Sequence, residues 1–186
     1  MLFRSLAIPR GGVIVGDEIA RNLGLPLDVV IAKKITPPDY PEYAIGSVTF
    51  DGVLFYGKNW SRYSEDSGFQ EEIDKKKAEV RRQIQEYRGH TNYALQGKTI
   101  LLVDDGIATG ATVSVILKWL EKKNTESIIL VTPVIPFTTH EIIKRFGIKI
   151  ISLEIPMTFS SVGQFYRKFD QIPDKIVLNI LQKYRN

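Results

Sequence analysis

The stretch Thr99-Ile100-Leu101-Leu102-Val103-Asp104-Asp105-Gly106-Ile107-Ala108-Thr109-Gly110-Ala111-Thr112 decides the fold of this 186-residue chain. An apolar run of strand length ends in two adjacent acids, and a short loop of small residues then leads into a helical pattern. In an open α/β sheet, ligands bind beyond the carboxyl ends of the strands, and a helix N-terminus offers free N–H groups to an anion. The segment therefore predicts a strand, a ligand-binding loop and a helix in direct succession.

The residue types in this loop suit a phosphorylated sugar. Thr109 and Thr112 offer hydroxyl donors, and Gly110 allows the backbone to approach an anion closely. The carboxylates of Asp104 and Asp105 accept hydrogen bonds from a vicinal diol. A plain turn before a helix accounts for any one of these features, but not for all of them in register after a buried strand. We therefore predict a site for a ribose 5-phosphate, with the phosphate in the loop and the hydroxyls on the acids.

Two other phosphate-binding motifs fit the segment less well. A P-loop requires G-x-x-x-x-G-K-[ST], and no lysine follows Gly110. The dinucleotide fingerprint G-x-G-x-x-G is also absent from this loop.

Strand and helix patterns alternate on both sides of this segment. Gly24 and Pro26 end the first helical pattern. Such alternation predicts a doubly wound α/β domain with a mainly parallel sheet. The expected elements are a strand at 2–8, a helix at 13–23, strands at 27–32 and 99–103, a helix from 110, a strand at 127–134, a helix at 137–146 and a strand at 149–154.

A different kind of segment separates the second and third of these strands. Its apolar runs flank Asp51-Gly52, which predicts a β-hairpin, and a long helical pattern follows. The expected parts are a Pro- and Tyr-rich loop at 34–43, hairpin strands at 44–48 and 53–56, a polar and mobile segment at 61–68 and a helix at 69–87.

Composition excludes several classes of protein. The chain has no cysteine, which removes disulfides, thiolate chemistry and the usual zinc sites. No apolar run approaches the roughly 18–20 residues that a membrane span requires. Residues 1–12 read as a strand and a turn rather than as a signal peptide. We therefore expect a cytoplasmic protein with no membrane partner.

The net charge of +4 raises the question of an anionic partner. Much of the excess lies between residues 75 and 88, where acids are mixed with the cations. A solvated helix face with ion pairs between neighbouring turns accounts for this pattern better than a nucleic-acid surface. No helix-turn-helix, zinc-finger or RRM signature is present in the sequence, so nucleic acid is not the expected partner.

The segment LLVDDGIATGAT at 101–112 resembles the motif with which type I phosphoribosyltransferases bind 5-phosphoribosyl 1-diphosphate (PRPP). The similarity extends over nearly the whole chain and is nearest to a group of bacterial and archaeal phosphoribosyltransferases of uncertain substrate. It implies the type I phosphoribosyltransferase fold in a single domain over 1–186, with a mobile flap and hairpin at 35–67 and a small hood at 155–172. The other shared motifs are Ile8 to Gly12, Lys33-Lys34, Pro41 to Gly46, Asp51-Gly52, Tyr87 to Gly89 and Val162 to Tyr166.

The resemblance also implies a role for each matched residue. A diphosphate site would use Arg10, Gly11 and Gly12 with Lys33 and Lys34, the lysines coming from the same or a neighbouring subunit. Taken without the resemblance, the glycines fit a tight turn with a surface arginine equally well. Asp104 and Asp105 would hold the ribose and, directly or through water, a Mg²⁺ ion. The rest of the PRPP loop would be Gly106, Ile107, Ala108, Thr109, Gly110, Ala111 and Thr112, and the residues facing the base would be Val162, Phe165 and Tyr166.

The implied reaction is a Mg²⁺-dependent transfer of ribose 5-phosphate from PRPP to an unidentified nitrogenous base in nucleotide metabolism, carried out by a homodimer. The same fold also serves regulators that bind PRPP without turnover, and such a regulator is the alternative. Where enzymes for hypoxanthine and guanine have an Asp, this chain has Ala108, which leaves adenine, orotate, uracil or an unusual acceptor open. Two features depart from the group, which has Arg at the position of Lys33 and a helix before the first core strand.

Overall fold

A computed structural model describes residues 2–37, 44–57, 60–63 and 67–185 of the chain. The chain divides into two compact units, which alternate along the sequence. Residues 1–30, 92–110 and 123–186 form the first unit, and residues 31–91 and 111–122 form the second. Among the described residues, no helix combines the length and the hydropathy that a membrane span requires.

The first unit is built on a five-stranded parallel sheet with the order β2-β1-β6-β7-β8. The central strand β6 is buried along its whole length, which explains why its sequence is a continuous apolar run. The sheet confirms the predicted α/β class with a mainly parallel sheet. Its strands are β1 (Phe3–Ala7), β2 (Leu27–Val29), β6 (Thr99–Val103), β7 (Ser127–Val134) and β8 (Lys149–Glu154).

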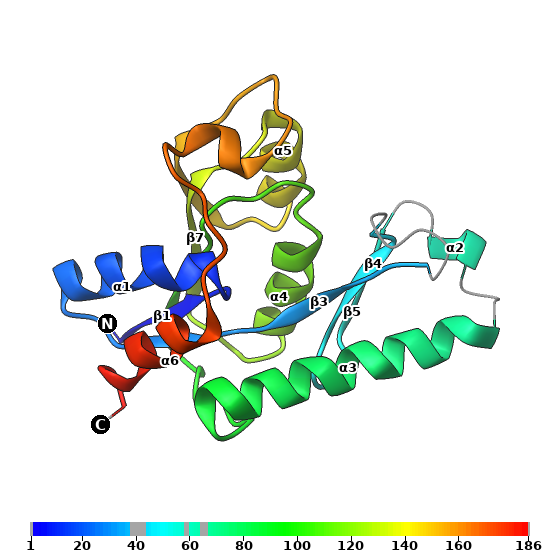
Figure 1. The fold of residues 1–186 in the computed structure, drawn as a ribbon, viewed down its shortest axis with the longest axis horizontal. Coiled ribbons are helices and arrows are strands. Elements are labelled where there is room, and N and C mark those ends of the chain that lie inside the picture. The colour runs from blue at the N-terminus through cyan, green and yellow to red at the C-terminus, as the bar shows by residue number, and fades with distance from the viewer. Residues whose placement is uncertain (1, 38–43, 58–59, 64–66, 186) are drawn as a thin grey trace. The chain divides into compact units, whose positions relative to one another are not determined.

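Among its described residues, the first unit also contains three α-helices and one 3₁₀ turn, namely α1 (Gly11–Leu23), α5 (Phe137–Lys144), α6 (Asp174–Gln182) and η1 (Val162–Phe165). Helix α1 ends at Gly24, whose φ of +63° lies in the left-handed region that favours glycine. Helices α1 and α6 lie side by side (Figure 1). They are joined at Asp17, whose carboxylate accepts hydrogen bonds from Tyr184 Oη at 2.7 Å and Lys183 Nζ at 3.0 Å.

The second unit packs a long helix along a three-stranded antiparallel sheet with the order β3-β4-β5 (Figure 1). The core between them contains Ile35, Ile45, Val48, Phe69 and Ile73. The elements of this unit are β3 (Ala32–Ile35), β4 (Gly46–Thr49), β5 (Leu54–Tyr56), α2 (Trp60–Tyr63), α3 (Ser67–Arg88) and α4 (Ala111–Glu121). The strands β4 and β5 confirm the predicted hairpin.

The charged face of α3 is held by ion pairs within the helix, as its sequence predicts. Lys76 Nζ lies 3.4 Å from a carboxylate oxygen of Glu72 and 3.3 Å from one of Glu79. Lys77 Nζ lies 3.2 Å from Asp74 Oδ1 one turn earlier. These pairs support a solvated helix face.

The predicted strand at 27–32 is wrong in its second half. Val29 pairs with Ala7, the last residue of β1, so the parallel ladder ends there. Ala32 pairs instead with Thr49 and begins a strand of the other sheet. The basic pair Lys33-Lys34 therefore lies inside β3 rather than after a strand.

Smaller differences concern segments expected to be irregular. In the predicted loop at 34–43, the first two residues belong to β3, and residues 38–43 lie outside the described part of the chain. The polar segment at 61–68 contains most of α2 and the start of α3, with 64–66 outside the described residues. The predicted helix at 137–146 ends two residues early, before Gly147 adopts a left-handed φ of +68°.

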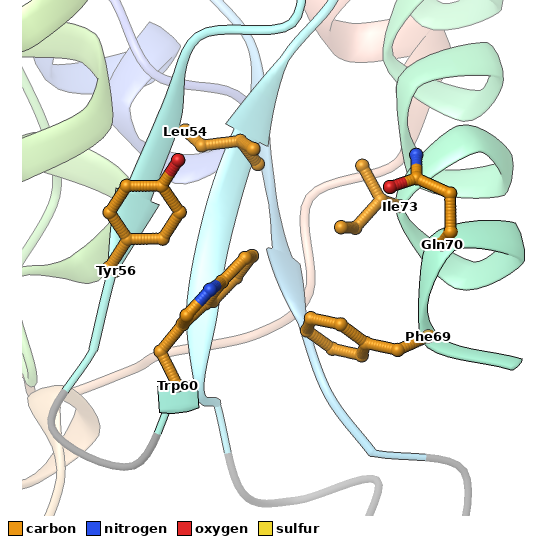
Figure 2. Close-up of a pocket in the computed structure, with 6 residues that line it drawn as sticks. All are labelled: Leu54, Tyr56, Trp60, Phe69, Gln70 and Ile73. Atoms are coloured by element: carbon orange, nitrogen blue, oxygen red, sulfur yellow. The ribbon is translucent and has the colours of Figure 1, made fainter. Parts of the chain in front are cut away.

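The second unit contains an aromatic pocket of about 310 Å³, lined by Leu54, Tyr56, Trp60, Phe69, Gln70 and Ile73 (Figure 2). The ring centroid of Trp60 lies 4.5 Å from that of Tyr56 and 4.9 Å from that of Phe69, both in edge-on arrangements. The indole is also packed on Gly46, where an added Cβ would lie 2.7 Å from Trp60 Cζ3. None of the described residues that line this pocket is acidic or basic, so we do not place the phosphate chemistry there.

Candidate functional site

Two neighbouring parallel strands bring the predicted diphosphate turn and the predicted acids together. Ala7 pairs with Val103, so β1 and β6 end at the same level of the sheet. The N–H of Ile8 donates to the carbonyl oxygen of Val103 at 2.8 Å and continues the pairing by one residue. The turn from Ile8 to Gly12 and the Asp104-Asp105 pair therefore leave the sheet side by side at its carboxyl edge.

The glycines of this turn lie directly against the acids. A Cβ built on Gly11 would lie 1.7 Å from Asp105 Oδ2, and one built on Gly12 would lie 3.0 Å from the Cα of Asp104. Real Cβ atoms do not approach other atoms as closely as the first of these distances. Glycine at position 11 is therefore required for the close approach of the turn to the Asp105 carboxylate.

The Asp105 carboxyl has an environment that disfavours its charge. Burial raises its pKa above 3.8, although hydrogen bonds that involve Asp104 and the backbone N–H groups of Asp105 and Gly106 act in the opposite direction. The backbone N–H of Asp105 donates to Asp104 Oδ1 at 3.0 Å. None of the ion pairs within the described part of the chain involves Asp105. Within the described residues, the burial of the Asp105 carboxyl is therefore not offset by an ion pair.

The loop after the acids is hydrogen-bonded to β7 and α5. The N–H of Ile107 donates to the carbonyl oxygen of Val134 at 2.9 Å. Thr139 Oγ1 donates to the carbonyl oxygen of Ala108 at 2.6 Å. Gly110 has a φ of +74°, and a Cβ there would lie 2.8 Å from Thr139 Cγ2. The loop from Gly106 to Gly110 thus has a fixed shape with its backbone close to its neighbours.

The segment that contains η1 contacts the loop at two adjacent residues. Tyr166 Oη donates to the carbonyl oxygen of Asp105 at 2.5 Å. Val162 packs on Gly106, where a Cβ would lie 2.2 Å from Val162 Cγ1. Burial, followed by the negative charges of Asp105 and Asp104, raises the pKa of Tyr166 to about 12. The Tyr166 hydroxyl is therefore a donor at any physiological pH.

Arg10 stands next to Gly11 at the start of α1. Its Nη1 lies 3.8 Å from Asp174 Oδ1 at the start of α6, and both side chains are more than one-third exposed. Such a pair contributes little to stability because water screens it. The guanidinium is thus held near the turn and is accessible to an anionic ligand.

Residues 6–145 match the sequence pattern of the phosphoribosyl transferase domain. The chain belongs to the phosphoribosyltransferase family. This result confirms the resemblance on which the site prediction rests.

The most similar proteins agree with this assignment. A protein of Mycobacterium tuberculosis that is assigned to the phosphoribosyl transferases, found in strains CDC 1551 and H37Rv, is 33% identical over 184 residues. The match covers 96% of this chain but 41% of the mycobacterial protein, so the chain spans about two fifths of that relative's length. A crystal structure of a Thermus thermophilus protein is 32% identical, has a TM-score of 0.83 and covers 100% of this chain and 89% of its own.

Most of the predicted site residues belong to the first unit. They are Arg10, Gly11, Gly12, Asp104, Asp105, Gly106, Ile107, Ala108, Thr109, Gly110, Val162, Phe165 and Tyr166. Four others belong to the second unit: Lys33 and Lys34 lie in β3, whereas Ala111 and Thr112 open α4. Phe165 is engaged by a stacked ring, that of Phe159, at a centroid distance of 6.0 Å.

Two residues near the candidate site were not predicted. Thr139 supports the loop through Ala108, and Asp174 pairs with Arg10. Neither carries a sequence signal, because each reaches the site from a segment more than 30 residues away in the chain. The Pro136-Phe137-Thr138-Thr139 stretch reads only as the start of a helix.

Proposed function

We propose that this chain transfers ribose 5-phosphate from PRPP to a nitrogenous base and releases pyrophosphate. The observation that carries the proposal is the contact of Gly11 and Gly12 with Asp105 and Asp104. In PRPP, the diphosphate on C1 is the neighbour of the 2- and 3-hydroxyls. A turn suited to the diphosphate and an acid pair suited to the diol must therefore adjoin, as they do at this edge of the sheet.

The ribose phosphate half of PRPP lies on the acids and the loop that follows them. Asp104 and Asp105 accept hydrogen bonds from the ribose hydroxyls. The loop at 106–112 receives the 5-phosphate at the N-terminus of α4, and the hydroxyls of Thr109 and Thr112 add donors. The left-handed Gly110 gives the loop its turn before α4 begins at Ala111.

The reaction exchanges one bond at C1 for another. The bond from C1 to the diphosphate oxygen breaks, its electron pair leaves with the diphosphate, and a bond from C1 to the acceptor nitrogen forms while that nitrogen gives a proton to water. Positive charge develops on the ribose, which the carboxylates of Asp104 and Asp105 favour. The cations of Arg10, Lys33 and Lys34 offset the charge of the leaving diphosphate.

Mg²⁺ fits the oxygen ligands of this site. The ion is commonly bound by one or two carboxylates together with substrate phosphates, and Asp104 and Asp105 offer such carboxylates. Within the described residues, three or more His, Asp or Glu side chains do not gather into a metal site, so the substrate would complete the coordination. When bound, the ion neutralises phosphate charge.

The acceptor side of the site is formed by the segment that contains η1. Val162 and Phe165 offer apolar surface to a planar base, and Ala108 is exposed and has no carboxylate. This composition favours an acceptor other than a 6-oxopurine. We also propose that the protein acts in the cytoplasm as a homodimer, in which Lys33 and Lys34 serve the same or the neighbouring subunit.

The test is calorimetric titration with PRPP and Mg²⁺, followed by measurement of pyrophosphate release with a panel of bases. Asp104→Asn with Asp105→Asn is expected to weaken PRPP binding by at least about tenfold, since two charge-assisted contacts are lost. Asp170→Asn is the matched control, because that carboxylate is 68% exposed. Unchanged PRPP affinity in the double variant would refute the site. Binding without release for any base would identify a PRPP-binding regulator instead.

A further inference from the structure

We infer that Tyr166 is a positioning residue, which fixes the peptide between Asp105 and Gly106 and thereby orients the Asp105 carboxylate, rather than a surface on which the base stacks. The inference rests on the proposed function only in naming the ligand. The contacts that support it all lie within the first unit.

The contact is between a side chain and a single peptide group. Tyr166 Oη donates to the carbonyl oxygen of Asp105 at 2.5 Å, across 61 residues of sequence. Because a peptide group is planar and trans, holding this carbonyl toward Tyr166 directs the N–H of Gly106 to the opposite side. The N–H of Gly106 favours the ionised form of Asp105, since it lowers the pKa of that carboxyl. One hydroxyl therefore fixes the peptide group that carries this N–H and adjoins the Asp105 side chain.

Packing holds Tyr166 in the position that this role requires. Val162, four residues earlier, packs on Gly106, so the segment touches both ends of the same peptide group. The N–H of Tyr166 donates to the carbonyl oxygen of Gly163 at 3.1 Å, and this hydrogen bond closes the turn between Val162 and Tyr166. The tyrosine ring packs on Phe169 with a centroid distance of 4.9 Å. The ring is thus engaged by Phe169 and the hydroxyl by the loop.

The affinity test uses Tyr166→Phe and ribose 5-phosphate, the part of PRPP that the acidic loop would hold. The variant keeps the ring and loses the hydroxyl, so ribose 5-phosphate is expected to bind about fivefold more weakly. Tyr184→Phe is the matched control, because it loses a hydroxyl that bonds Asp17 in the same unit. The control is expected to lower the melting temperature and to leave the affinity unchanged. Equal affinity of Tyr166→Phe and the wild type would overturn the inference.

Hydrogen exchange tests the same role without a ligand. The N–H groups of Asp105 and Ile107 are hydrogen-bonded in the loop, and they are expected to exchange faster in Tyr166→Phe but not in Tyr184→Phe. If the wild type binds no ribose 5-phosphate, the proposed function fails while this measurement still decides the role of Tyr166. Unchanged exchange at both amides would count against the positioning role.

The contact of Val162 with Gly106 can be tested by enlarging Gly106 and then shortening Val162. Gly106→Ala introduces a methyl group at the place that Val162 occupies, so it is expected to displace the segment and weaken ribose 5-phosphate binding. Adding Val162→Ala makes room for that methyl group and is expected to restore most of the affinity. If the double variant does not recover affinity for ribose 5-phosphate, the result would contradict a positioning role of the contact between Val162 and Gly106.

Discussion

Gly11 and Asp105 show how closely single residues determine this site. The Asp105 carboxylate occupies the space that any side chain at position 11 would need. It is also half-buried, and no cation of the described residues forms an ion pair with it, so burial raises its pKa. Both features have the same origin, which is the close approach of the β1 turn to the acids after β6. A substitution at Gly11 therefore tests the space around the Asp105 carboxylate, and a substitution at Asp105 tests the cost of its charge.

Replacement of Gly11 by alanine is expected to weaken PRPP binding by more than about tenfold, because the new methyl group must displace the Asp105 carboxylate. Calorimetric titration measures the effect. Gly24→Ala is the control: its φ of +63° strains an added side chain, yet nothing lies within 4 Å of the new Cβ. It should therefore lower the stability by about 1 kcal/mol without changing PRPP affinity. PRPP binding that survives in Gly11→Ala would contradict the close contact.

Asp105→Asn is expected to raise the melting temperature at neutral pH while it weakens PRPP binding. Burial raises the pKa of Asp105 in the folded state above its ordinary value of 3.8. The folded state then binds more protons than the unfolded state between these two values, so stability falls as the pH rises through that window. Thermal unfolding should show the advantage of the variant at about pH 7 and its disappearance below about pH 3.8. A variant that is less stable at neutral pH would contradict the charge penalty.

At the scale of elements, helix α6 illustrates how the end of the chain supports the candidate site. Its first residue, Asp174, pairs with Arg10 at the start of α1, and Lys183 just beyond its end bonds Asp17 further along α1. Val177, Ile180 and Leu181 form its buried face. The helix therefore contacts α1 at both ends, and Arg10, in the turn that leads into α1, is one of its contacts.

Tyr184→Phe is expected to lower the free energy of unfolding by about 1 kcal/mol, the usual contribution of a hydrogen bond. Tyr184 Oη donates to Asp17 Oδ1 at 2.7 Å. Although burial raises the pKa of Asp17, the hydrogen bonds from Tyr184 and Lys183 lower it below 3.8 overall. Stability from the ionised Asp17 is then present above pH 3.8 and lost as the pH falls through the lowered pKa. Denaturant unfolding measures the difference, and equal stability of variant and wild type would exclude the contribution.

At the scale of the whole molecule, the candidate residues are shared between two units. The acids, the glycine turn and the Tyr166 segment belong to the first unit, whereas Lys33 and Lys34 belong to the second. The chain passes between the units four times, at residues 30–31, 91–92, 110–111 and 122–123. Of the residues proposed to bind the diphosphate, Arg10, Gly11 and Gly12 belong to the first unit, and Lys33 and Lys34 belong to the second.

Lys33→Met with Lys34→Met tests whether the second unit contributes to PRPP binding. If both cations act on the diphosphate, the variant is expected to bind PRPP at least about tenfold more weakly and ribose 5-phosphate equally well, since only PRPP carries the diphosphate. Lys75→Met with Lys122→Met is the control, because both of these lysines are exposed in the same unit. An equal loss for both ligands would point to a general effect of charge or folding.

The sequence by itself predicted most strands and helices of this phosphoribosyltransferase-family chain and the position of its acidic loop, but not β3, α2 or α6. The predicted strands at 99–103, 127–134 and 149–154 coincide with β6, β7 and β8. Of these, β6 is buried along its whole length and is a continuous apolar run, whereas β8 lies at the edge of the sheet and has no buried residue. The hairpin around Asp51-Gly52 was likewise readable from local turn chemistry.

Only the tertiary structure decided where β2 ends, where α6 packs and what Tyr166 contacts. Residues 27–32 form one apolar run, yet Val29 pairs with Ala7 whereas Ala32 pairs with Thr49. The sequence indicated that Tyr166 could face the base, whereas in the structure its hydroxyl donates to the carbonyl oxygen of Asp105. Local patterns reflect burial and backbone preference, whereas these outcomes depend on partners many residues away, and such partners are chosen by packing in three dimensions.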